Sequence, residues 1–207
     1  MLRLILLRHG QSEGDITGRH EGRADFPLTD LGKKQAQLVA NYLSIYYGID
    51  EIYCSPLKRA KETANILGKK IMNQPIEEKE LMEINNGDLA GLTFEEAEKK
   101  FPPPESEKIY RALPNGESII DFRARIEAFW HKFKDENLQP NRQKTICIVA
   151  HGGTISMLYK TILELPINTH TKFPTADTGF HLLEITPKDI IILKANCLEH
   201  LYLNNEG

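Results

Sequence analysis

The sequence predicts an α/β layered fold with a mainly parallel sheet, built as one domain of 207 residues. Three short apolar runs, residues 2–7, 49–54 and 145–150, have the composition of buried strands. Segments with apolar residues at helical spacing separate these runs, and such alternation is typical of helices packed on a parallel sheet. Near the end, residues 180–185 and 190–195 are expected to form a hairpin.

The first two helices have recognisable start signals. Thr29 can cap a helix whose apolar positions recur at spacings of three and four. Those positions are Ala36, Val39, Ala40, Leu43 and Tyr47. Ser55 and Pro56 indicate a cap followed by a proline at the first helical position, and Gly68 is expected to end this second helix. We expect a short strand around residues 76–79.

Residues 84–116 interrupt the alternation of strands and helices. They hold three consecutive prolines at 102–104 and Asn-Gly pairs at 86–87 and 115–116. We therefore expect an excursion or lid over a site rather than core.

Two more helices complete the expected elements. One runs from about Glu117 into the 130s, and the spacing of its aromatic residues indicates core packing rather than a stacking surface. Another follows His151, from Thr154 to about Leu163. We expect His131, His170 and His200 to lie at the surface or at an interface.

Cations and imidazoles follow three of the expected strands at the point where each strand ends. Arg8 and His9 come after the first run, Arg59 after the second and His151 after the third. Because the carboxyl ends of parallel strands are where ligands bind in open α/β sheets, we expect these four side chains to meet at one edge. Two guanidinium groups and two imidazoles suit a phosphate monoester, which carries nearly two negative charges.

Motifs along most of the chain resemble the histidine phosphatase superfamily, which includes cofactor-dependent phosphoglycerate mutase. They are, in order, Leu7-Arg8-His9-Gly10-Gln11-Ser12-Glu13, Asp25-Phe26-Pro27-Leu28-Thr29, Ser55-Pro56-Leu57 with Arg59-Ala60, Leu81-Met82-Glu83 with Gly87, Asn115-Gly116-Glu117-Ser118 and Ala150-His151-Gly152-Gly153. The resemblance implies a phosphoglycerate mutase-like fold, a three-layer α/β/α sandwich with a mainly parallel mixed sheet. It also implies a single histidine phosphatase domain over residues 1–207.

The chemistry expected at this edge is phosphoryl transfer through a covalent intermediate. A neutral imidazole can attack phosphorus, but the residues alone leave both His9 and His151 as candidate nucleophiles. The resemblance implies that His9 is the nucleophile, that His151 stabilises charge on the phosphoryl oxygens, and that Glu83 is the acid and base. Arg8 and Arg59 are suited to bind two phosphoryl oxygens.

Three further residues are expected to bind substrate: Ser12, Arg19 and Gly152. Ser12 could instead only bond a turn. Two interpretations of Arg19, and of His20 and Arg23 near it, stay open. They bind a second anionic group of the substrate, or they are solvated loop charges.

Asp15 and Gly153 depart from the family pattern, which commonly has Asn at the first position and, in mutases, at the second. We expect Asp15 to face away from the phosphate or to pair with Arg19.

These features favour a phosphomonoester hydrolase acting through phosphohistidine on a small phosphorylated metabolite. The alternative is a cofactor-dependent phosphoglycerate mutase, against which both departures count. A non-catalytic phosphate-binding module is disfavoured because binding alone needs no acid such as Glu83.

Composition sets the remaining expectations. The formal net charge is −3 with 27% charged residues, so no global basic field indicates a nucleic-acid partner. Three scattered cysteines, Cys54, Cys147 and Cys197, form neither a disulfide framework nor a zinc motif and suit a reducing compartment. We expect no metal, no cofactor and no membrane segment, and therefore a cytoplasmic protein. A homodimer is compatible with the sequence.

Overall fold

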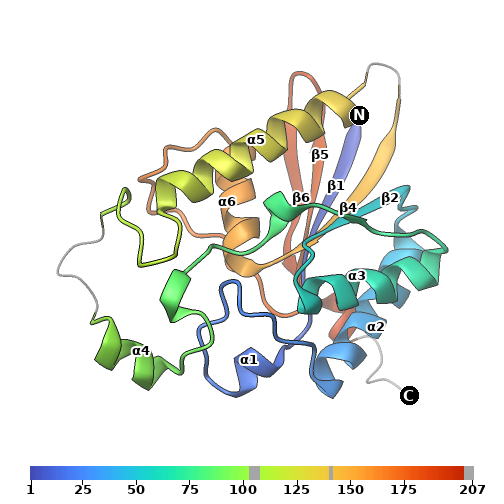
Figure 1. Ribbon diagram of the computed structural model, residues 1–207. Coiled ribbons are helices and arrows are strands. Elements are labelled where there is room, and N and C mark those ends of the chain that lie inside the picture. Colours follow the sequence, from blue (N-terminus) through green and yellow to red (C-terminus); the bar gives the residue numbers. More distant parts are fainter. Residues whose placement is uncertain (103–107, 140–141, 203–207) are drawn as a thin grey trace.

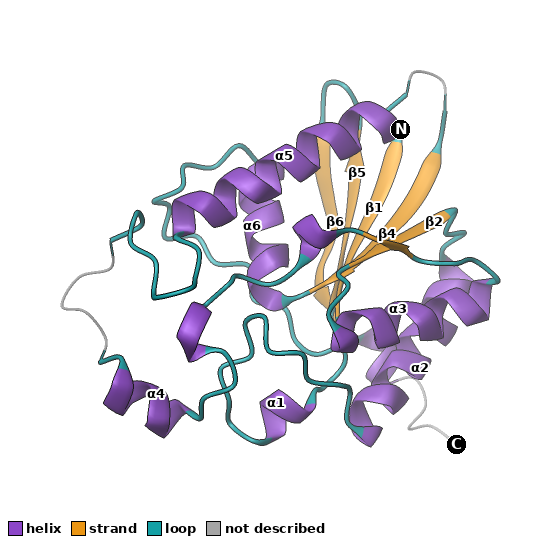
Figure 2. Cartoon of the chain, in the orientation of Figure 1, coloured by secondary structure: helices purple, strands orange, loops and turns teal. Residues whose placement is uncertain are grey.

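The computed structural model describes residues 1–102, 108–139 and 142–202, and it confirms the layered α/β fold (Figure 1, Figure 2). Six strands form one sheet in the order β3-β2-β4-β1-β5-β6. The strands are β1 (Leu2–Arg8), β2 (Glu51–Cys54), β3 (Ile76–Glu77), β4 (Lys144–Ala150), β5 (Phe180–Ile185) and β6 (Ile190–Cys197). The helices are α1 (Glu13–Ile16), α2 (Asp30–Tyr46), α3 (Lys58–Ile71), α4 (Phe94–Lys100), α5 (Ile119–Asn137), α6 (Gly152–Ile162) and α7 (Glu199–Tyr202), with single 3-10 turns at Lys79–Leu81 and Gly87–Leu89.

The sheet is mixed, and its parallel part determines where the site lies. Strands β1 and β2 both pair with β4 in parallel, and β3 extends this part at its edge. The carboxyl ends of β1, β2 and β4 therefore meet at one edge of the sheet. Strand β5 runs antiparallel to β1, so the residues that precede β5 reach the same edge.

Two apolar cores fill the spaces between the layers. One lies between the sheet and the pair α5 and α6, and the other between the sheet and the pair α2 and α3. The aromatic face of α5 packs in the first core, with Phe122, Phe129, Trp130 and Phe133 at most 5% exposed. This confirms the core-packing interpretation of its spacing.

Helix α3 differs from the sequence expectation at both ends. It begins at Lys58 rather than at Pro56, because the Ser55 hydroxyl contacts an imidazole instead of only capping the helix. It ends after Ile71, with Met72 in the left-handed region, so Gly68 lies inside the helix. A Cβ at Gly68 would approach the carbonyl oxygen of Asn73 to 2.4 Å, so the glycine leaves room for the returning chain.

Residues 84–102 and 108–116 form loops, a 3-10 turn and α4 beside the edge of the sheet where β1, β2 and β4 end (Figure 1). Residues 103–107 of this segment lie outside the described part, and its action as a lid stays a prediction. His200 is buried at 2% exposure, so its expected place at the surface is wrong. Every helix within the described ranges is too short or too polar to cross a membrane.

Candidate active site

Backbone hydrogen bonds between strand ends assemble the site. Arg8 is the last residue of β1 and lies opposite Ala150, the last residue of β4. The His9 N–H then donates to the Ala150 carbonyl at 3.1 Å, so His9 lies directly beside His151. Their ring centroids are 5.1 Å apart. The sheet thus brings together two imidazoles that are 142 positions apart in the sequence numbering.

His9 is a neutral imidazole with one free lone pair. Its Nδ1 lies 2.7 Å from the Gly10 carbonyl oxygen, which can only accept, so Nδ1 carries the proton and Nε2 does not. The side chain is 1% exposed, and burial, followed by the charges of Arg59 and Arg8, holds its pKa well below the usual range. Nε2 accepts a hydrogen bond from Arg59 Nε at 3.2 Å. This atom is therefore available as a nucleophile.

His151 lies beside His9 at the same edge of the sheet. Its Nε2 is 2.8 Å from the Ser55 hydroxyl, while its buried Nδ1 has no hydrogen-bond partner within the described residues. Burial and the charge of Arg59 lower its pKa well below the usual range as well. An arriving anion would favour the protonated form, in which both ring nitrogens donate.

Arg59 is completely buried, and most of its donors are already used. Its Nη1 and Nη2 donate to the carbonyls of Ala24 and Gly22 at 2.9 and 2.8 Å. Its Nε faces His9 and Glu21. Each terminal nitrogen thus gives one of its two N–H groups to a loop carbonyl, and the binding of phosphoryl oxygens by Arg59 stays a prediction.

Arg8 projects from the end of β1 between two acidic side chains. Its Nη2 lies 3.1 Å from Asp177 Oδ1 and 3.5 Å from Asp15 Oδ1, and Nη1 donates to the Thr175 carbonyl. Its buried Nε is unpartnered among the described residues. The structure thus pairs Asp15 with Arg8 rather than with Arg19, because the capping contact of Asp15 with Ser12 turns its carboxylate toward β1.

Glu83 lies near Arg59, and its carboxyl group is held at the start of α6. Its Oε2 accepts from the Gly153 N–H at 2.9 Å, and its Oε1 accepts from the Ile84 N–H at 2.8 Å. A Cβ at Gly153 would lie 2.5 Å from Glu83 Oε1, so any side chain there would displace this carboxylate. The departure at Gly153 is therefore part of how this chain positions Glu83.

The three expected substrate-binding residues lie in different settings. Ser12 is fully buried, caps α1 and donates from its hydroxyl to Glu21 Oε1. Arg19 donates to the Gly91 carbonyl at 2.6 Å and so ties two loops together. Gly152 opens α6 beside the pocket, with no atom within 4 Å of the position that a Cβ would take.

Sequence reasoning missed three residues of this site: Glu21, Asp177 and the role of Ser55. Glu21 lies between His20 and Arg23 in the sequence, and neither its spacing nor its neighbours indicate a functional role. Asp177 could have been found from topology, since residues before an antiparallel neighbour of β1 reach the edge where β1 ends.

The described residues contain no group of three or more His, Cys, Asp or Glu that could hold a metal ion.

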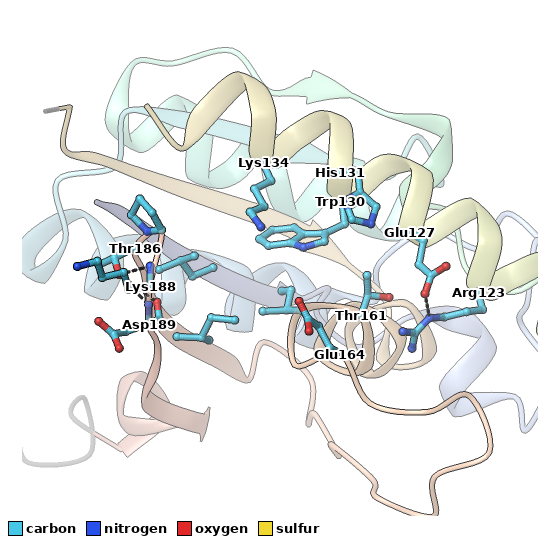
Figure 3. A pocket seen from close by; sticks show the side chains of 14 residues that line it. Arg123, Glu127, Trp130, His131, Lys134, Thr161, Glu164, Thr186, Lys188 and Asp189 are labelled. Carbon is cyan, nitrogen blue, oxygen red and sulfur yellow. Dashed lines mark hydrogen bonds and ion pairs between the residues drawn. The ribbon is translucent and has the colours of Figure 1, made fainter. Parts of the chain in front are cut away.

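A cavity of about 460 Å³ lies between α5, the end of α6 and the turn joining β5 to β6 (Figure 3). It is at the opposite end of the sheet from His9 and contains none of the site residues. The candidate site is the edge where Arg8, His9, Arg59, Glu83 and His151 meet: two buried imidazoles, one buried and one partly exposed guanidinium, and a carboxyl group.

Comparison with known proteins agrees with this arrangement. The model of the histidine phosphatase superfamily, branch 1, matches residues 4–198. The chain belongs to this superfamily. Phosphoserine phosphatase 1 of Hydrogenobacter thermophilus is 30% identical over 97% of this chain and 95% of its own length. An uncharacterized phosphatase of Bacillus subtilis, PhoE, is 32% identical over 78% of each chain.

Solved structures of similar proteins share the whole fold. Mycobacterial glucosyl-3-phosphoglycerate phosphatase in complex with VO3 aligns over 95% of this chain and 99% of its own, with a TM-score of 0.83 and 26% identity. A putative α-ribazole-5′-P phosphatase from Escherichia coli aligns over 95% and 96%, with a TM-score of 0.84 and 26% identity. This histidine phosphatase is therefore a phosphatase enzyme with a phosphoglycerate mutase-like fold.

Proposed function

We propose that this histidine phosphatase hydrolyses a small phosphorylated metabolite, without a metal ion, through a phosphohistidine formed on His9. The observation that carries the proposal is the Nδ1–H tautomer of His9, which leaves the Nε2 lone pair between Arg59 and His151. The unpartnered buried Nε of Arg8 and Nδ1 of His151 are the kind of donors that an anion would satisfy. The first N–H groups of α6 add a further favourable field for a dianion.

In the first step, His9 Nε2 attacks phosphorus and forms the P–N bond while the P–O bond to the leaving group breaks. Glu83, in its protonated form, gives a proton to the departing oxygen. The cations around the pocket counter the charge on the phosphoryl oxygens, as a metal would elsewhere. Arg8 is held by Thr175 and Asp177, and Arg59 by Gly22 and Ala24, so neither side chain has to reorganise during transfer.

In the second step, a water molecule attacks phosphorus, the P–N bond breaks, and inorganic phosphate leaves. Glu83 takes the proton of that water and is ready for the next turnover. One carboxyl group therefore serves as acid and then as base. Its anchorage by the N–H groups of Ile84 and Gly153 supports this role, because it keeps the group at one place through both steps.

The substrate class is inferred from the relatives, whose names specify phosphoserine, glucosyl-3-phosphoglycerate and α-ribazole-5′-P. All three are small phosphorylated molecules. We assign the choice among such substrates to the segment 84–116, acting as a lid, together with Arg19, His20 and Arg23. The proposal extends to a cytoplasmic location, which the three free, buried cysteines support, to a homodimer, and to the absence of a nucleic-acid partner.

Replacement of the nucleophile tests the proposal. His9→Ala should lower turnover of p-nitrophenyl phosphate by about 10⁴-fold or more, the scale on which loss of a covalent nucleophile acts. Wild-type enzyme quenched during turnover should carry one acid-labile phosphoryl group, and the His9→Ala variant should carry none. The assay repeated with EDTA tests metal independence, and a mutase assay with a bisphosphate primer tests the alternative reaction.

His170→Ala is the matched control, because His170 is an exposed histidine outside the site. It should keep full turnover and labelling. Acid-stable label, or label on the His9→Ala variant, would show that the nucleophile is another residue.

A further inference from the structure

The carboxyl group of Glu21 borders the volume that a phosphoryl group on His9 would fill. Its Oε1 accepts from the Ser12 hydroxyl and lies 3.4 Å from Arg59 Nε. Its Oε2 lies 4.0 Å from His9 Nε2, the proposed attacking atom. A phosphorus atom bonded to Nε2 carries three oxygens into this space, beside the Glu21 carboxyl group.

A charged carboxylate at this place opposes the binding of a dianion. The groups facing Glu21 are Arg59 from α3, Arg8 and His9 from the end of β1, and Asp15 from α1. Asp15, with Asp177 beside it, already lies against Arg8. With Glu21 ionised, three carboxylates therefore stand against two arginines before any phosphate arrives, and His9 adds no charge. Either the dianion binds weakly or one carboxyl group becomes neutral.

Glu21 has little freedom to leave the pocket. Its side chain is 16% exposed and packs so closely on α1 that a Cβ at Gly14 would meet its Cγ at 2.8 Å. The carbonyl of the next residue, Gly22, is bonded to the buried guanidinium of Arg59. Protonation is thus a smaller change than displacement of the loop.

We propose that Glu21 takes up one proton from solvent when a phosphoryl group binds, and that its carboxylic O–H then donates a hydrogen bond to a phosphoryl oxygen. Glu21 is in this way a phosphate-binding residue, in its neutral form. The proposal rests on the proposed function only in assuming that the phosphoryl group of the substrate enters this pocket.

The electrostatics of the empty site support proton uptake. Burial raises the pKa of Glu21, although Arg59 and the Ser12 hydroxyl act in the opposite direction. A dianion placed beside it raises the pKa further, because it disfavours a second negative charge. Wherever the free enzyme holds the ionised form, substrate has to bind together with a proton.

The test is the pH dependence of KM for phenyl phosphate between pH 7.5 and 9.5, where this ester is already a dianion with a second pKa near ~6. In the wild-type enzyme KM should rise at least about tenfold per pH unit. In Glu21→Gln, which keeps the shape and a hydrogen-bond donor, the rise should be smaller by about tenfold per pH unit, and KM should be at least about tenfold lower than wild type at pH 9.5. The exposed Glu13→Gln, on the helix α1 against which Glu21 packs, should match wild type.

A second variant keeps Glu21 but shifts the pH at which its carboxyl group ionises. Ser12→Ala removes the hydroxyl that stabilises the ionised carboxylate, so the rise in KM should begin at a higher pH. Equal pH slopes in wild type and Glu21→Gln, or a wild-type KM that does not change with pH, would overturn the proposal.

The outcome for Glu21 is separable from the outcome for hydrolysis. If the wild-type enzyme fails to turn over phosphate esters, the proposed function is wrong. Proton uptake on binding inorganic phosphate is then measured by calorimetry at pH 9, in two buffers that differ in their heat of ionisation. The wild type should take up about one proton more per bound phosphate than Glu21→Gln, and no difference between them would reject the role of Glu21.

Discussion

Ser55 orients an imidazole of the site without reaching the substrate position. Its hydroxyl is fully buried and lies 2.8 Å from His151 Nε2. Its own N–H is bonded to the Val149 carbonyl of β4, so the sheet fixes the hydroxyl in place. The same hydroxyl accepts from the Leu57 N–H at 3.3 Å, just before α3 begins at Lys58.

Ser55→Ala should leave both ring nitrogens of His151 without a partner among the described residues and should lower kcat by about tenfold. An unpaired buried polar group costs about 1–3 kcal/mol, so the free energy of unfolding should fall by a similar amount. Steady-state kinetics and urea unfolding measure the two effects.

The control is the same substitution in a His151→Asn background. If Ser55 acts through His151, it should change kcat little in that background, since coupled residues are not additive. A full tenfold loss there would place Ser55 in a separate role.

At this scale the sequence predicted residues that follow strand ends and missed those whose position depends on packing. Arg8, His9, Arg59 and His151 were predictable because apolar runs show where strands stop. The contact of Asp15 with Arg8 was not, since the cap of a four-residue helix determines where that carboxylate points.

Helix α5 holds the loop that carries the proposed acid. Arg125 donates from Nη1 to the carbonyls of Glu80 and Met82, at 2.5 and 2.9 Å, and from Nη2 to Glu117 Oε1 at 2.5 Å. Its Nη2 also lies 3.4 Å from the Glu83 carbonyl. One guanidinium therefore fixes the backbone that positions the Glu83 carboxylate.

Arg125→Lys should slow the hydrolysis of alkyl phosphates by about tenfold or more and should affect p-nitrophenyl phosphate much less. A lysine keeps the charge but cannot make these contacts together, and only poor leaving groups need help from an acid. The ratio of kcat values on the two substrates is the measurement.

Arg123→Lys is the matched control on the same helix. Arg123 pairs with Glu127 and faces the cavity at the other end of the sheet (Figure 3), so its loss should not change the ratio. Equal losses on both substrates for Arg125→Lys would mean that α5 stabilises the fold without positioning Glu83.

Among the elements, strands and long amphipathic helices were predictable, whereas helix ends were not. The expected apolar runs correspond to β1, β2 and β4, and the expected hairpin to β5 and β6. The runs of β1 and β4 were the clearest, because a strand buried between layers is continuously apolar. The start of α3 depends on which partner the Ser55 hydroxyl takes, a tertiary contact that local signals do not contain.

Across the whole molecule, buried neutral histidines make stability depend on pH. His181 Nδ1 accepts from the Asn196 N–H, so its Nε2 carries the proton that faces the Thr175 hydroxyl. Burial lowers the pKa of His181 and of His200 to about 4. In the unfolded chain both titrate near ~6.5.

The contribution of these two histidines to the free energy of unfolding should therefore be complete above about pH 6.5. It should be lost as the pH falls toward 4, because the unfolded chain binds more protons than the folded chain between these two values. Each of these histidines contributes a slope of about 1.4 kcal/mol per pH unit. The free energy of unfolding in urea at pH 7, 6 and 5 measures it.

Glu21 and Asp177, whose pKa values burial raises, act in the opposite sense, so the comparison of variants is the sharper test. His181→Asn should reduce the slope by about 1.4 kcal/mol per pH unit relative to wild type. An unchanged slope would mean that His181 stays accessible to protons in the folded protein.

The deep burial of Arg59 has a consequence for engineering this enzyme. Within the part of the chain that the structure describes, its guanidinium donates to the backbone carbonyls of Gly22 and Ala24 and to His9, and its Nε also faces the Glu21 carboxyl group. A library of variants that alters the backbone of residues 21–24 would leave a buried charge without its hydrogen-bond partners. A lysine at position 59 would not restore these contacts. Diversity intended to retune substrate choice belongs instead in residues 84–102 and 108–116, where new loop sequences leave this arginine solvated.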